Sequence, residues 1–175
     1  MEVALISKNS LKIKGRHASF GVDDSDKSIY NGVIFLNKIP EQLNLENDTV
    51  AINGPGEYES GGVKITGSRN DGEMFYNLNM DGVEILLGKL SVLEKQQHKL
   101  KDQHIVVVYV DFITNASFVT SLASSVVIFY GEQASALVEK LGKENIKAVQ
   151  KYTAISGKLP VEVETVILEE QISNF

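Results

Sequence analysis

The chain has 175 residues, 43% of them apolar, which suits one globular domain, and we expect a single domain over residues 1–175. Cysteine is absent, which excludes disulfides, thiol catalysis and thiolate metal ligands and fits a cytoplasmic protein. The net charge of −6, with no long apolar stretch and no signal-peptide pattern, predicts neither nucleic-acid binding nor membrane insertion.

The first half of the chain reads as a meander of short β-strands. The clearest hairpin joins residues 74–79 to 83–87, because Asp81 and Gly82 supply the positive φ that a tight turn needs. The polar stretch DDSDKSIYNG, residues 23–32, is predicted to be a loop, and a solvated acidic segment is favoured there over a site for a hard cation. Further strands are predicted over 3–7, 11–14, 18–22, 32–36, 49–52 and 63–67.

The second half alternates strands and helices. Ser91 and Glu94 match a capping box, which predicts a helix over 91–101. Gly142 follows an amphipathic pattern over 133–141 and is a typical helix stop. Other elements are predicted as a helix over 115–124, buried strands over 104–110 and 125–131, and closing strands over 146–152 and 161–169. A meander followed by this alternation predicts an α+β or layered αβ domain with two facing sheets and helices outside.

A glycine-rich stretch, NGPGEYESGGVKI, occupies residues 53–65. Its glycines and proline favour a tight backbone reversal, and the acidic and tyrosine side chains are expected to brace that turn by hydrogen bonds. The alternative is that Glu57 and Tyr58 bind a ligand or carry out chemistry. We interpret the stretch as a structural turn motif made of Gly54, Pro55, Gly56, Glu57, Tyr58 and Glu59.

Residues 52–67, INGPGEYESGGVKITG, resemble the pattern I-x-G-P-G-E-Y-E-x-x-G-V-x-I-x-G of prokaryotic zinc-dependent hydrolases with the metallo-β-lactamase fold. The segments LISKNSLKIKG, MFYNLNMDGVEILLGKL and IVVVYV resemble neighbouring family segments in the same order. The resemblance implies an αββα sandwich, shortened here. It also implies hydrolysis by a metal-bound hydroxide, in which zinc lowers the pKa of water.

The family's ligand signature is absent from this sequence. That signature reads H-x-H-x-D-H after a buried strand, with two later histidines and a bridging aspartate. Here the strand over 32–36 is followed by NKIPE, and the later H-L-G-D aligns with LGKL at 87–90. The chain has three histidines, His17, His98 and His104, and none aligns with a ligand. We therefore expect no metal, no cofactor and no catalytic residues of the family's kind.

Three functions remain open. The first is a non-catalytic module that binds or serves structurally through self-association, as a homo-oligomer with an unknown protein partner. The second is a hydrolase with a relocated or metal-independent site, drawing on Asp23, Asp24, Asp26, Glu57 and Glu59 with His17 or His104 as base. The third is a small-anion or peptide-binding domain that uses the vestigial cleft. Residues that replace or neighbour the expected ligand positions are Lys8, Asn9, Asn37, Lys38 and Lys89.

Overall fold

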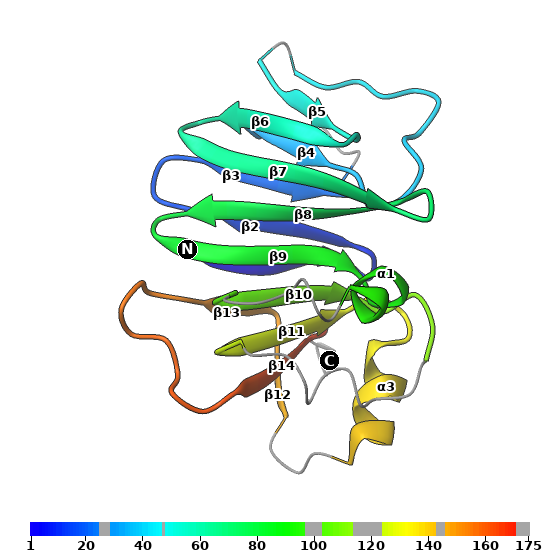
Figure 1. The fold of residues 1–175 in the computed structure, drawn as a ribbon, viewed down its shortest axis with the longest axis vertical. Coiled ribbons are helices and arrows are strands. Elements are labelled where there is room, and N and C mark those ends of the chain that lie inside the picture. Colours follow the sequence, from blue (N-terminus) through cyan, green and yellow to red (C-terminus); the bar gives the residue numbers. More distant parts are fainter. Residues whose placement is uncertain (25–28, 47, 97–102, 114–123, 143–145, 171–175) are drawn as a thin grey trace, which may run out of the picture.

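The computed structural model describes residues 1–24, 29–46, 48–96, 103–113, 124–142 and 146–170, and these fold into two β-sheets packed face to face (Figure 1). One sheet has the order β13-β1-β2-β3-β4-β5. Its strands are β1 (Glu2–Ser7), β2 (Ser10–Lys14), β3 (Ser19–Val22), β4 (Gly32–Ile34), β5 (Val50–Ile52) and β13 (Lys151–Thr153). The two facing sheets confirm the layered arrangement expected from the sequence.

The larger sheet has the order β12-β14-β11-β10-β9-β8-β7-β6. It joins an antiparallel meander, β6 to β9, to parallel strands β9, β10, β11 and β14. Its strands are β6 (Gly56–Ser60), β7 (Val63–Asn70), β8 (Glu73–Met80), β9 (Val83–Lys89), β10 (Ile105–Tyr109), β11 (Val126–Tyr130), β12 (Lys147–Val149) and β14 (Glu164–Leu168).

The larger sheet is apolar on both faces because it lies between two hydrophobic layers. In β10, Ile105 and Val107 point into the core between the sheets, whereas Val106 and Val108 point to the opposite layer. That opposite layer is covered by two helices, α1 (Leu90–Lys95) and α3 (Ala134–Leu141). The continuous run HIVVVYV is therefore explained by a strand buried on both sides, as predicted, and the structure shows that this strand is parallel to both of its neighbours.

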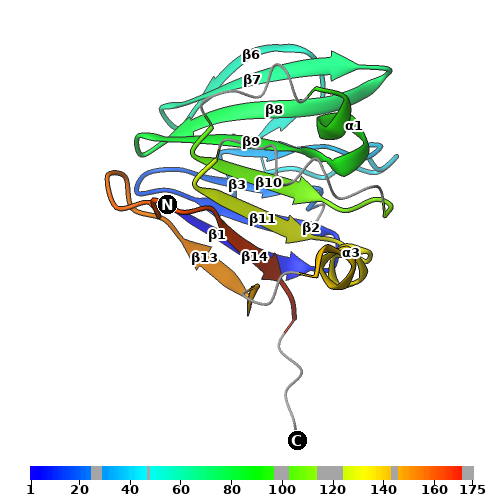
Figure 2. The same cartoon turned by 60° about the horizontal axis from the view of Figure 1, so that its bottom comes forward.

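Both described helices lie at the end of the larger sheet where β9, β10 and β11 finish (Figure 2). The outer face of the smaller sheet is covered differently, because Tyr30, Val33 and Phe35 pack there against Leu43 and Leu45 of the connection between β4 and β5. No helix of the described residues is long and apolar enough to cross a membrane.

The turn prediction at Asp81 and Gly82 is confirmed, with φ angles of 54° and 76°. The stop at Gly142 is confirmed as well, because this residue caps α3 in the left-handed conformation.

In the second half of the chain, two element predictions were wrong. The stretch over 146–152 is two strands in different sheets, β12 and β13, which are separated at the exposed Gln150. The capping box at Ser91 does not form: Ser91 lies inside α1, and its backbone N–H and hydroxyl contact the Asp111 carboxylate, at 3.3 Å and 2.5 Å. An acid distant in sequence therefore takes the place that Glu94 was expected to fill.

The predicted helix over 115–124 lies outside the described residues except for Ser124, as do residues 97–101 of the helix predicted over 91–101.

Candidate functional site

Several strands of both sheets end at one edge of the sandwich, and each contributes a polar side chain there. Asp23 follows β3, Lys89 ends β9, Tyr109 ends β10 and Tyr130 ends β11. Asn37, from the segment after β4, completes the set by its hydrogen bonds to Asp23. We call these five side chains the cleft residues. Within each sheet their proximity arises because the carboxyl ends of parallel strands meet at the same edge, and the packing of the two sheets brings these edges together.

Asp23 is held firmly by the segment that follows β4. Its Oδ1 accepts the backbone N–H groups of Leu36 and Asn37, both at 3.0 Å, and its Oδ2 accepts the Asn37 side-chain amide at 2.9 Å. Its φ of 48° is a left-handed conformation that aspartate tolerates better than most residues. Burial raises the pKa of the Asp23 carboxyl, against the opposing effect of these hydrogen bonds and of the Lys89 charge.

Two tyrosines pack together beside Asp23. The rings of Tyr109 and Tyr130 meet edge to face, with centroids 5.3 Å apart. The Tyr109 hydroxyl donates to Asn9 Oδ1 at 3.3 Å, whereas the fully buried Tyr130 hydroxyl has no hydrogen-bond partner among the described residues. Burial, and then the Asp23 charge, raise the pKa of both tyrosines, so both hydroxyls stay protonated at neutral pH.

Lys89 is engaged in an ion pair at this edge. Its Nζ lies 2.9 Å from Glu73 Oε2 on the neighbouring strand β8, and its side chain is only 13% exposed. An ammonium group that is held here opposes the binding of a second cation in the cleft, because like charges at short range repel.

A hollow of about 290 Å³ adjoins the cleft. Its walls come from both sheets, and apolar side chains such as Phe35, Ile39 and Met74 form part of the lining. We call it the basic hollow after its polar lining, which consists of Asn37, Lys38, Asn53, Arg69, Glu73 and Lys89.

The structure brings together Asn37, Lys38 and Lys89 of the predicted vestigial cleft, because all three line the basic hollow. Asn9 reaches the cleft residues through Tyr109. Lys8 instead lines a separate hollow of about 620 Å³ together with Gly131 to Ser135.

Sequence reasoning missed Tyr109 and Tyr130, because they read as the last residues of buried strands. Arg69 was also missed, because it lies in a polar turn region of the sequence. The signal that could have identified the tyrosines was their position at the ends of two strands that had been predicted to be buried, which the structure shows to be parallel.

The turn motif over 54–59 lies against β7. The Tyr58 hydroxyl donates to the Gly54 carbonyl at 2.9 Å, and a Cβ on Gly67 would lie 2.4 Å from the same oxygen. Gly56 to Ser60 form the edge strand β6, which is a correction to their assignment as a turn, and Glu57 and Glu59 project from it into solvent. None of the residues 54–59 lines the basic hollow.

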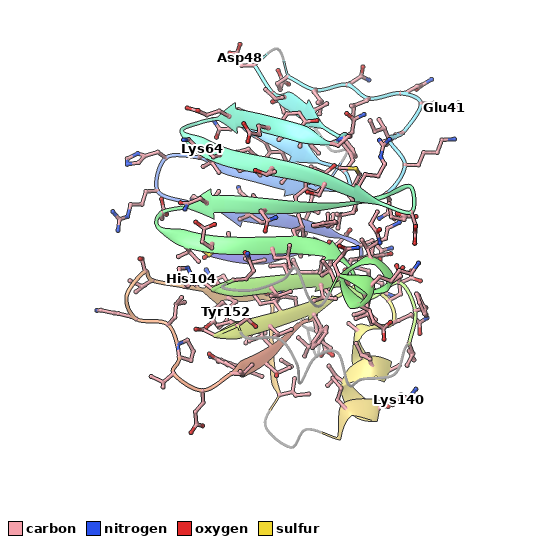
Figure 3. All side chains as sticks on the ribbon, viewed as in Figure 1. Glu41, Asp48, Lys64, His104, Lys140 and Tyr152 are labelled. Carbon is pink, nitrogen blue, oxygen red and sulfur yellow. The ribbon has the colours of Figure 1, made fainter. Side chains whose placement is uncertain are left out.

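The groups suggested for a relocated hydrolase are dispersed in the described residues. Asp24 is buried and accepts a hydrogen bond from the Tyr30 hydroxyl. His17 is exposed in the connection between β2 and β3. His104 lies at the start of β10, at the far edge from α1, where its Nδ1 accepts the Glu84 N–H at 2.9 Å (Figure 3). Asp26 and His98 lie outside the described residues.

The chemistry of the cleft residues does not fit a dinuclear zinc centre. Such a centre needs several imidazole and carboxylate donors converging on one point. Here the oxygens of the one cleft carboxylate, Asp23, already accept three hydrogen bonds, and Lys89 adds a cation beside it. Within the described ranges, no group of three or more histidine, cysteine, aspartate or glutamate side chains is placed to hold a metal ion.

Comparison with solved structures shows the metallo-β-lactamase-like fold. A candidate Zn-dependent hydrolase of the metallo-β-lactamase superfamily from Thermotoga maritima matches with a TM-score of 0.75 and 15% identity, over 97% of this chain and 100% of that chain. A candidate metal-dependent hydrolase from Parabacteroides distasonis matches with a TM-score of 0.58 and 13% identity, over 97% of this chain and 93% of that chain. No protein-family model and no curated protein matches the sequence. The predicted fold class is confirmed.

Proposed function

We propose that the chain is a metallo-β-lactamase-fold protein without the family's zinc centre, and that it serves as a binding module through the cleft residues and the basic hollow. One observation carries the proposal. The edge where β3, β9, β10 and β11 end holds a hydrogen-bonded aspartate, a paired lysine and two protonated tyrosines in place of converging imidazoles. Such groups bind and orient a polar ligand, and they do not activate water as a metal does.

The relocated hydrolase receives less support. Catalysis by an acid and a base requires both groups within hydrogen-bond reach of the reacting atoms. Among the described candidates, Asp24 and His104 are each committed to a neighbour, and Asp23 already accepts three hydrogen bonds. The remaining described candidates, His17, Glu57 and Glu59, are exposed to solvent.

The test is metal content together with turnover. Untagged protein is incubated with zinc, dialysed and measured by elemental analysis, and the same sample is assayed for phosphodiesterase and lactonase activity. We expect well below one zinc ion per chain and no turnover. Retention of about one or two zinc ions per chain, with turnover that depends on them, would overturn the proposal.

A further inference from the structure

We propose that the basic hollow binds a small phosphomonoester. This inference rests on the proposed binding function and names the class of ligand. The basic hollow is built from segments far apart in the sequence: Lys38 follows β4, Asn53 follows β5, Arg69 lies on β7 and Lys89 ends β9. Both sheets thus contribute to one site.

The charge balance of the basic hollow is the first argument. Its lining has three cations, Lys38, Arg69 and Lys89, and one carboxylate, Glu73. Glu73 pairs with Lys89 at 2.9 Å. Among the described residues no carboxylate forms an ion pair with Lys38 or Arg69. Two cations therefore face the same space without a counter-charge, on a chain whose net charge is −6.

Two uncompensated cations match a dianion. A phosphomonoester carries a charge of about −1.5 to −2 at pH 7 and presents three acceptor oxygens. The guanidinium of Arg69 offers a planar fork that pairs with two of these oxygens, and the ammonium of Lys38 adds a point charge. A monocarboxylate would leave one of the two cations without a partner.

The size and the walls of the basic hollow limit the rest of the ligand. Its volume of about 290 Å³ lies just below the usual range for small-molecule sites, roughly 300 to 1,000 Å³, so the ligand must be small. Phe35, Ile39 and Met74 provide an apolar wall for a short carbon skeleton. The negative net charge of the chain disfavours polyanions, so the expected ligand is a small molecule and not a nucleic acid.

The experiment is a calorimetric titration of the full chain with methyl phosphate at constant ionic strength. Succinate and chloride are the comparison anions. The variants are Arg69→Gln and Lys38→Gln, and the matched control is Lys64→Gln, an exposed cation on the same strand β7 as Arg69 but outside the basic hollow (Figure 3). Thermal unfolding without ligand checks that each variant folds as the parent does.

We expect saturable binding of methyl phosphate by the parent and by Lys64→Gln. In Arg69→Gln and in Lys38→Gln the affinity should fall by about tenfold or more, as expected for the loss of a charged hydrogen bond. Absence of saturable binding would overturn the inference, as would equal weakening in Lys64→Gln. Succinate that binds as tightly as methyl phosphate would show that the ligand class is wrong. Zinc content measured on the same sample keeps the two proposals apart, because zinc-dependent turnover contradicts the proposed function and loss of phosphate binding alone contradicts only this inference.

Discussion

The Oδ2 atom of Asp23 accepts a hydrogen bond from the Asn37 side-chain amide at 2.9 Å, while its Oδ1 accepts the Asn37 backbone N–H at 3.0 Å. One carboxylate thereby ties the end of β3 to the segment after β4, which lines the basic hollow. The acidic residue that the sequence suggested as part of a solvated loop is instead an anchor of the candidate site.

The Asp23 carboxyl should make stability depend on pH. Burial raises its pKa above the unfolded value of about 3.9, so the folded chain binds the proton more tightly than the unfolded chain. As pH rises from about 3.9 through the raised pKa, the parent should lose stability relative to Asp23→Asn, which has no proton to lose. Urea unfolding between about pH 4 and pH 7 measures this difference.

The control for that measurement is Asn37→Ala, which removes the side-chain hydrogen bond and leaves the ionisable group in place. The difference in the free energy of unfolding between Asn37→Ala and the parent should change less with pH than the difference between Asp23→Asn and the parent. If the difference in the free energy of unfolding between Asp23→Asn and the parent does not change with pH, or shifts in favour of the parent as pH rises, burial is not the dominant influence on the pKa of Asp23.

The Tyr130 hydroxyl should contribute nothing favourable to stability. It is fully buried without a hydrogen-bond partner among the described residues, and an unsatisfied buried polar group is unfavourable by about 1–3 kcal/mol. Tyr130→Phe should therefore be as stable as the parent or more stable by up to about 1 kcal/mol, measured by urea unfolding.

Tyr76→Phe is the matched control. The Tyr76 hydroxyl donates to the carbonyl oxygens of Phe35 and Ile52, at 3.2 Å and 3.3 Å, so its removal should destabilise the chain by about 1 kcal/mol. If Tyr130→Phe destabilises the chain as much as Tyr76→Phe does, the Tyr130 hydroxyl has a bonded partner in solution, such as a water molecule in the cleft.

Gly67 should not tolerate a side chain. A Cβ at this position would lie 2.4 Å from the Gly54 carbonyl oxygen and 3.1 Å from the Tyr76 ring. Gly67→Ala should therefore reduce the free energy of unfolding by about 1–3 kcal/mol, the usual range for overpacking. Thr66→Ala, at an exposed position of the same strand, should change it by less than about 0.5 kcal/mol. Equal stability of the two variants would mean that the turn motif moves away from β7 at no cost.

Self-association stays a prediction. Within the described chain β5 and β6 are edge strands that lie next to each other in sequence, and exposed edge strands offer unpaired backbone groups to a second chain. Sedimentation equilibrium should give a mass of at least about twice the 19.2 kDa of the chain. If β6 is the contact, Glu57→Pro, at an exposed residue of β6, should lower the association constant. A mass of one chain at all concentrations would reject self-association.

Most of the β-strands and the layered arrangement of the sheets could be predicted from the sequence alone. The local signals were the alternation in the meander, the Asp81–Gly82 turn and the apolar run over 104–110. They are local because the pattern of apolar residues in a strand indicates whether one or both of its faces are buried. The number of histidines was equally visible: the chain has three, and donors must be present in the chain before any fold can gather them.

The sequence could not show where the candidate functional groups meet. Asp23, Arg69 and Tyr130 come from three distant segments, and the sequence does not encode which strand ends share an edge. The division of residues 146–152 between two sheets and the use of Asp111 at the start of α1 have the same cause. In each case the partner is set by which strands lie next to each other in the folded chain, so long-range contacts override the local pattern.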